Sequence, residues 1–236
     1  MSQQTVRVPY LRVIRSPRYF PLWLGQIISN LGDTLNYVAL VVLVFRLSHS
    51  GLAVSALVLA EIVPTLLLGP IAGVAIDRFD RKRVLIVVDS LRAVLVLVLA
   101  LTHALWAVYL LATLLAVGST LFNPALQAVI PALLTDEERL AANSVAWSSG
   151  RLVQIIGASV AGGLIAWAGT TPAFLVNAAS FAFSAVMLAR LSIPARQGSS
   201  RGGGLASWLR DAGEGVAYAR RDPFVALCWL ISPSTA

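Results

Sequence analysis

The stretch GVAIDRFDRKR, residues 73–83, lies between two long apolar runs of this 236-residue chain. The runs, 52–76 and 84–101, are each long enough to cross a bilayer as a helix. Six of the seven residues from 77 to 83 are charged, and their net charge is positive. Positively charged loops of membrane proteins stay in the cytoplasm, so the stretch predicts a tight cytoplasmic turn between two membrane spans.

The composition also indicates a membrane protein. Hydrophobic residues make up 58% of the chain and charged residues only 12%, whereas soluble domains carry about 25% charged residues. The basic residues behind the net charge of +7 cluster before the first apolar run, in the charged turn, and between residues 190 and 221. There they are expected to meet lipid head groups. Since the chain has no basic groove with stacking aromatic side chains, nucleic acid is not an expected partner.

Apolar segments of spanning length recur along the chain. We place six of them, at about 20–45, 52–76, 84–101, 104–122, 144–168 and 172–191. Runs near 20 residues fit helices rather than the strands of a barrel, which need only ~10 residues. The loops after the first, third and fifth segments hold almost no Lys or Arg, and the loops after the second, fourth and sixth segments hold the charges. We therefore predict an all-α membrane protein whose amino terminus is cytoplasmic.

The segments divide the chain into three parts. Residues 1–191 are predicted to form a six-helix transmembrane bundle. Residues 192–222 form a cytoplasmic linker, which is rich in Gly, Ser and Arg and then becomes amphipathic. Residues 223–236 begin a seventh apolar run that is too short to cross a membrane.

The charged turn resembles the loop motif G-x-x-x-D-R-x-G-x-K/R-K/R of the major facilitator superfamily. Asp80 stands where this motif has its second glycine, and the residues that match it are Gly73, Asp77, Arg78, Lys82 and Arg83. Further stretches resemble the bacterial branch that includes the enterobactin exporter and the macrolide-efflux permeases, namely residues 23–33, 89–92, 131 with 138–143, and 157–169. Two departures are the lack of arginine in the fourth span and Ala158 in place of a usual proline.

The resemblance implies a fold and an activity. The fold is the amino-terminal half of a transporter, built as two inverted three-helix repeats around a polar cavity. The activity is proton-coupled efflux of an amphipathic drug or siderophore across a bacterial inner membrane. By analogy with the family, the turn together with Asp89 and Arg92 forms a cytoplasmic network of ion pairs that breaks when the transporter changes state.

A polar stripe follows one face of the first span. Gln26, Asn30, Asp33 and Tyr37 recur at helical spacing, and Asn36 borders them. A charge at the centre of a span costs roughly 3 kcal/mol or more to insert, so Asp33 is expected to face a wet cavity. Burial favours the protonated form of such a carboxyl group, which suits proton coupling.

Four other features in the spans are candidates for the transport pathway or for packing. Glu61 lies in the middle of the second span, where function and structural pairing are both open. Arg151 and Gln154 in the fifth span either face the cavity or anchor a helix end. Asp89 and Arg92 are three residues apart and are expected to pair with each other. Small residues spaced for close helix contact are expected at Gly69, Gly157 and Gly162.

The sequence argues against an enzyme. It contains no phosphate-binding G-x-x-x-x-G-K-[ST] loop and no evident hydrolytic set of Ser, His and carboxylate. A single Cys and two distant His predict neither a metal site nor a cofactor. Since only half of a transporter is expected, three possibilities stay open: a truncated product, a half-transporter completed by a second copy or another chain, or a membrane scaffold.

Overall fold

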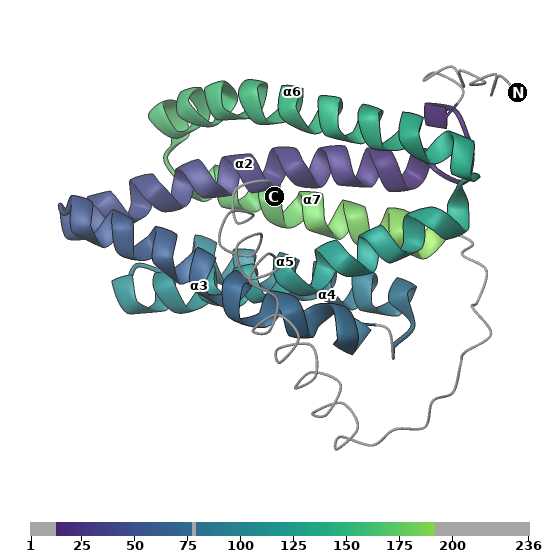
Figure 1. Cartoon of the computed structure of the whole chain (residues 1–236). Helices are drawn as coiled ribbons and strands as arrows, with labels where there is room; N and C mark the ends of the chain where they lie inside the picture. Colours follow the sequence, from purple (N-terminus) through teal and green to yellow (C-terminus); the bar gives the residue numbers. More distant parts are fainter. Residues whose placement is uncertain (1–12, 77–78, 192–236) are drawn as a thin grey trace, which may run out of the picture.

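The computed structural model describes residues 13–76 and 79–191. The elements within this part of the chain are helices, as the sequence predicts (Figure 1). Their bounds are α2 Phe20–Ser48, α3 Gly51–Ile76, α4 Arg81–Ala100, α5 Leu105–Leu133, α6 Asp136–Ala168 and α7 Thr171–Arg190. The linker predicted at 192–222 and the run at 223–236 lie outside the described residues.

Five of these helices are long and apolar enough to cross a membrane. The sixth, α4, begins with Arg81, Lys82 and Arg83, and its apolar part starts at Val84, where the sequence places the third span. The chain is therefore a multi-pass membrane protein.

Two helices are longer than their apolar segments. α5 continues to Leu133, eleven residues past the predicted end at 122, and contains Pro124 and Pro131. α6 begins at Asp136 instead of 144, because Thr135 and Glu138 form a capping box that starts the helix in a polar stretch. The length of an apolar run therefore predicts the membrane-buried part of these helices, and it underestimates how far each helix extends beyond that part.

The helices pack as two equivalent sets of three. α2 packs against α6 and α7, while α5 packs against α3 and α4, and α4 also contacts α7. Exchanging α2, α3 and α4 with α5, α6 and α7 leaves this list of contacts unchanged. Figure 1 shows α2 beside α6, and α3 with α5 on the other side of the molecule. This arrangement fits two inverted three-helix repeats.

The contact between α2 and α7 is close because Gly32 has no side chain. A Cβ atom at Gly32 would lie 2.5 Å from Oδ1 of Asn177 and would also clash with Oγ of Ser180. Asn177 and Ser180 are themselves buried and are joined by a hydrogen bond from the hydroxyl of Ser180 to Oδ1 of Asn177, 3.1 Å. α2 and α7 are therefore joined through small and polar side chains, as is common between membrane helices.

The predicted packing glycines behave differently from one another. A Cβ atom at Gly157 would lie 3.1 Å from Leu31 and 3.2 Å from Thr34, so Gly157 brings α6 close to α2. At Gly69 and Gly162 nothing lies within 4 Å, so neither glycine is at a close helix contact within the described residues, and their role in packing stays a prediction. Spacing alone does not show which face of a helix meets a neighbour.

The contrast between Gly32 and Gly162 gives a stability prediction. Gly32→Ala should destabilise the bundle by about 1–3 kcal/mol, because the new methyl group overpacks the contact with α7. Gly162→Ala is the matched control, and it should leave stability unchanged or slightly raised because Ala is the better helix former. Thermal unfolding of the purified chain in detergent measures both, and equal midpoints for Gly32→Ala and the unsubstituted chain would contradict the proposed clash.

Candidate functional site

A cavity of about 360 Å³ lies at the centre of the bundle. Side chains from α2, α3, α4, α5 and α7 line it, and charged, polar and apolar groups are all present. Two acids and one arginine line the cavity, and each comes from a different helix: Asp33 from α2, Glu61 from α3 and Arg92 from α4. This volume lies within the range typical of pockets that hold small molecules.

The polar stripe of α2 reaches the cavity only in part. Asp33 and Tyr37 line the cavity together with Asn36. Gln26 is half-buried and is not part of the cavity lining. Its Nε2 has no hydrogen-bond partner among the described residues. Asn30 is exposed and faces Gly150 of α6. The stripe therefore borders two different surroundings, the cavity and α6.

The second acid, Glu61, enters the cavity from α3. Thr65, one turn further along, also lines the cavity and is contacted by Thr120 of α5 through a hydrogen bond between their hydroxyl groups, 3.2 Å. Pro64 lies inside α3 and is buried. Glu61 and Asp33 are close enough for their charges to interact. The two acids thus form one acidic region of the cavity, shared by α2 and α3.

The cation of the cavity is Arg92, whose side chain is only 4% exposed. Its Nη1 lies 3.4 Å from Oδ1 of the fully buried Asp89, so the predicted pair is present. The guanidinium group also lies over the rings of Phe122 and Phe181, 4.9 and 5.1 Å from their centroids. Gly118 makes room for it, because a Cβ atom there would lie 3.2 Å from Nε of Arg92. Aromatic rings on both sides stabilise a buried cation that has only one acid beside it.

The analogy with the family groups Arg92 with the charged turn, whereas the structure places Arg92 at the central cavity. Arg92 is the twelfth of the 20 residues of α4, which puts it about 16 Å from the start of the helix. At that depth it belongs to the cavity rather than to the charged turn. Two features of the sequence indicate that Arg92 belongs to the cavity. Arg92 lies deep in its span, and the fourth span has no arginine, so α4 is left to supply the cation.

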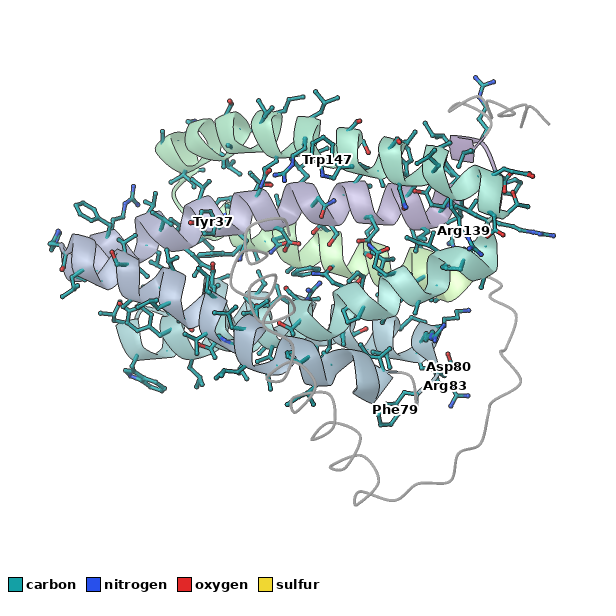
Figure 2. The ribbon with its side chains drawn as sticks, in the orientation of Figure 1. Tyr37, Phe79, Asp80, Arg83, Arg139 and Trp147 are labelled. Carbon is teal, nitrogen blue, oxygen red and sulfur yellow. The ribbon has the colours of Figure 1, made fainter. Side chains whose placement is uncertain are left out.

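Arg151 does not line this cavity. Its Nη1 donates a hydrogen bond to Oε1 of Gln154, 2.9 Å away, and its guanidinium lies over the ring of Trp147, 5.3 Å from the centroid. Both polar side chains are exposed on α6. Figure 2 shows Trp147 on α6, where it can cover the guanidinium. Arg151 is the sixteenth of the 33 residues of α6 and the eighth of the predicted span at 144–168, so its role as an anchor near the end of the span stays a prediction.

The charged turn is held by backbone contacts. Asp80 has an extended conformation, φ −63° and ψ 108°, and its carboxylate accepts hydrogen bonds from the backbone N–H groups of Lys82 and Arg83 at the start of α4. This position needs no left-handed backbone, which explains why Asp can replace the glycine of the motif. Gly73 has open space around it, and Asp77 and Arg78 lie outside the described residues. Figure 2 shows Asp80 and Arg83 beside the labelled Phe79 at this end.

Lys82 connects the turn to the end of α7. Its Nζ donates hydrogen bonds to the carbonyl oxygens of Ala189 and Leu191, at 2.8 and 2.6 Å. A cation at this place also interacts favourably with the dipole of α7. Arg83 instead forms an exposed ion pair with Asp80, 3.7 Å. Lys82 in the described part of the turn therefore fastens α4 to α7.

Comparison with known proteins gives a consistent picture. The family model described as Major Facilitator Superfamily matches residues 22–235. The chain is 34% identical over 165 residues to the uncharacterized MFS-type transporter YfiS of Bacillus subtilis, a match that covers 70% of this chain and 40% of that protein. It is 27% identical over 126 residues to macrolide efflux protein A of Streptococcus pyogenes, covering 51% and 31%.

A further relative is the lysophospholipid transporter LplT of Serratia proteamaculans, 28% identical over 170 residues, covering 72% of this chain and 41% of that protein. Each of these three matches covers less than half of the relative's length. The relatives are transporters by name, so the prediction against an enzyme is confirmed. With nearly the whole chain matched by the family model, the chain belongs to the Major Facilitator Superfamily.

Proposed function

We propose that this chain supplies the amino-terminal half of a secondary transporter that exports an amphipathic small molecule in exchange for protons. The observation that carries the proposal is the central cavity, in which Asp33, Glu61 and Arg92 face one another from three helices. Ionisable groups inside a membrane bundle are costly, and they commonly mark the path of a substrate or a proton. The site is proposed to lie in the inner membrane of a bacterium.

The two acids support coupling to protons. Asp33 and Glu61 are close enough to repel each other when both are ionised. Taking up one proton relieves this repulsion, and releasing it restores the repulsion, so the cavity has two states of different charge. We propose Asp33 as the main proton carrier, because its charge interacts with the charges of both Glu61 and Arg92.

The lining and the relatives support an amphipathic substrate. Ala112, Leu115 and Ala116 of α5 and Phe181 of α7 form an apolar part of the cavity lining. Two of the relatives are named for macrolide efflux and for lysophospholipid transport. Ligands of both kinds carry a polar part and a large apolar part, which such a cavity can accommodate.

The outer surfaces of α3 and α6 support the need for a second unit. Leu52 and Leu67 of α3 and Ile155 of α6 are 81%, 66% and 68% exposed. Gly69 of α3 and Gly162 of α6 leave room for another helix to approach. In transporters built from repeats, the substrate lies between two such halves. We propose that the second half is another polypeptide segment or a second copy, and a scaffold that only binds partners through these faces is the alternative.

The proposed orientation predicts the outcome of reporter fusions. Green fluorescent protein fused after residue 80 or residue 200 should fluoresce, and alkaline phosphatase at the same places should be inactive, because both places are cytoplasmic. Alkaline phosphatase inserted at residues 49–50 or 102–103 should be active. An active phosphatase after residue 80 would reverse the orientation and contradict the proposal.

Proton-coupled export predicts a loss of function at Asp33. Cells that express the chain should accumulate less of a fluorescent amphipathic dye than cells with empty vector, and an uncoupler should remove the difference. Asp33→Asn should raise accumulation to the level of empty vector, because the amide cannot carry the proton. Glu137→Gln, which neutralises an exposed acid in the first turn of α6, is the matched control and should export normally.

The same assay separates transport from the alternative. Equal dye accumulation with the unsubstituted chain, Asp33→Asn and empty vector would exclude transport by this chain alone. Cross-linking in membranes would then show whether it associates with a second copy or with another protein.

A further inference from the structure

The cavity carries both signs of charge, and the two signs come from different sides. Arg92 projects from α4, and the acids Asp33 and Glu61 project from α2 and α3. α4 and α2 both pack against α7, which lies between them. The cavity therefore has a basic side at α4 and an acidic side at α2 and α3.

Arg92 has hydrogen-bonding capacity that the protein does not use. A guanidinium group has five N–H donors, and strong pairs with carboxylates use two parallel bonds of about 2.7–2.9 Å. The contact with Asp89 is single and longer, 3.4 Å from Nη1 to Oδ1. Oδ2 of Asp89 and Nε of Arg92 have no hydrogen-bond partner among the described residues. Phe122 and Phe181 lie over the guanidinium and Nε lies against Gly118, so the Nη atoms are the donors that Arg92 has for an anionic group in the cavity that it lines.

The acidic side is equally open to a ligand. Among the described residues, neither Asp33 nor Glu61 forms a salt bridge. Both side chains are partly accessible and line the cavity. A ligand with a single charge would contact either Arg92 or the two acids, but not both. A ligand that carries both charges would satisfy both sides at once.

We infer that the cavity recognises zwitterionic amphiphiles, with the anionic group of the ligand on Arg92, its ammonium group on Glu61 and Asp33, and its apolar part along α5. This inference rests on the proposed function and names the class of substrate. The apolar wall from Ala112 to Ala116 borders the charged region, so a head group with two charges and a hydrocarbon chain match the lining. A phosphoethanolamine head group has the required chemistry.

Three probes with the same tail test the inference. Dodecyl phosphate carries only an anionic group, dodecylamine only a cationic group, and dodecylphosphoethanolamine carries both. Binding to the full chain is measured in nanodiscs of phosphatidylglycerol, a lipid whose head group is not zwitterionic, with empty nanodiscs as the blank. We expect dodecylphosphoethanolamine to bind at least about tenfold more tightly than either of the other probes, because it gains a second charged contact.

Substitutions should remove the two contacts separately. Arg92→Gln should weaken dodecylphosphoethanolamine by about tenfold or more and leave dodecylamine unchanged. Glu61→Gln should weaken dodecylphosphoethanolamine and dodecylamine and leave dodecyl phosphate unchanged. Glu137→Gln is the control for Glu61→Gln, since it neutralises an exposed acid on α6.

A second variant moves Arg92 without removing its charge, in case Arg92→Gln fails to fold. In Gly118→Ala, the new Cβ atom would lie 3.2 Å from Nε and 3.3 Å from Cγ of Arg92, so the guanidinium must shift. The two phosphate-bearing probes should bind severalfold more weakly, and dodecylamine should bind as before. Gly162→Ala, where nothing lies within 4 Å, is the matched control and should change nothing.

Two results would overturn the inference. One is equal binding of the three probes, or tighter binding of a singly charged probe. The other is a loss of affinity by the same factor for all three probes in Arg92→Gln and Glu61→Gln, which would mean that these residues act through the fold. Since binding is measured without a gradient, absence of dye export would count against the proposed function and leave a charge-selective binding pattern intact.

Discussion

Charged side chains in a membrane-spanning bundle must face an opposite charge, an aromatic ring or water, because hydrocarbon solvates none of them. This constraint organises the centre of the molecule. A single Asp or Arg in the middle of a span costs roughly 3 kcal/mol or more to insert. Asp33, Glu61 and Arg92 all turn toward the cavity, and Asp89 is buried beside Arg92. The rotations of α2, α3 and α4 about their axes follow from this requirement.

The helices without central charges complete the arrangement. α5 supplies Gly118 and Phe122, which fit around Arg92, and α7 supplies Phe181 on its other side. The close approach of α2 and α7 at Gly32 keeps Asp33 near the groups of α7. Gly118 and Phe122 of α5 and Phe181 of α7 thus position the charge of Arg92, which belongs to α4.

The sequence predicts the helices well and their contacts only in part. Long apolar runs and the alternation of basic loops are sufficient for the spans, since length and charge decide insertion. The spacing of Asp33, Asn36 and Tyr37 correctly groups them, because residues on one helical face stay together wherever that face points. Which helix lies opposite depends on packing between segments far apart in sequence. For that reason the spacing of small residues cannot separate Gly157, which meets α2, from Gly162, which meets no neighbour within the described residues.

Arg92 shows why a buried pair and a binding group are hard to separate from sequence. The spacing of Asp89 and Arg92 predicts an ion pair, and the pair exists, but its single 3.4 Å contact is weaker than a bidentate bridge. A tighter pair would hold α4 in one arrangement and use the donors of Arg92 within the protein. Buried ion pairs contribute little net stability compared with apolar packing, so stability alone is a weak reason to keep one at this depth. Two phenylalanine rings and a glycine stabilise the guanidinium instead, and they leave its Nη atoms as donors at the wall of the cavity.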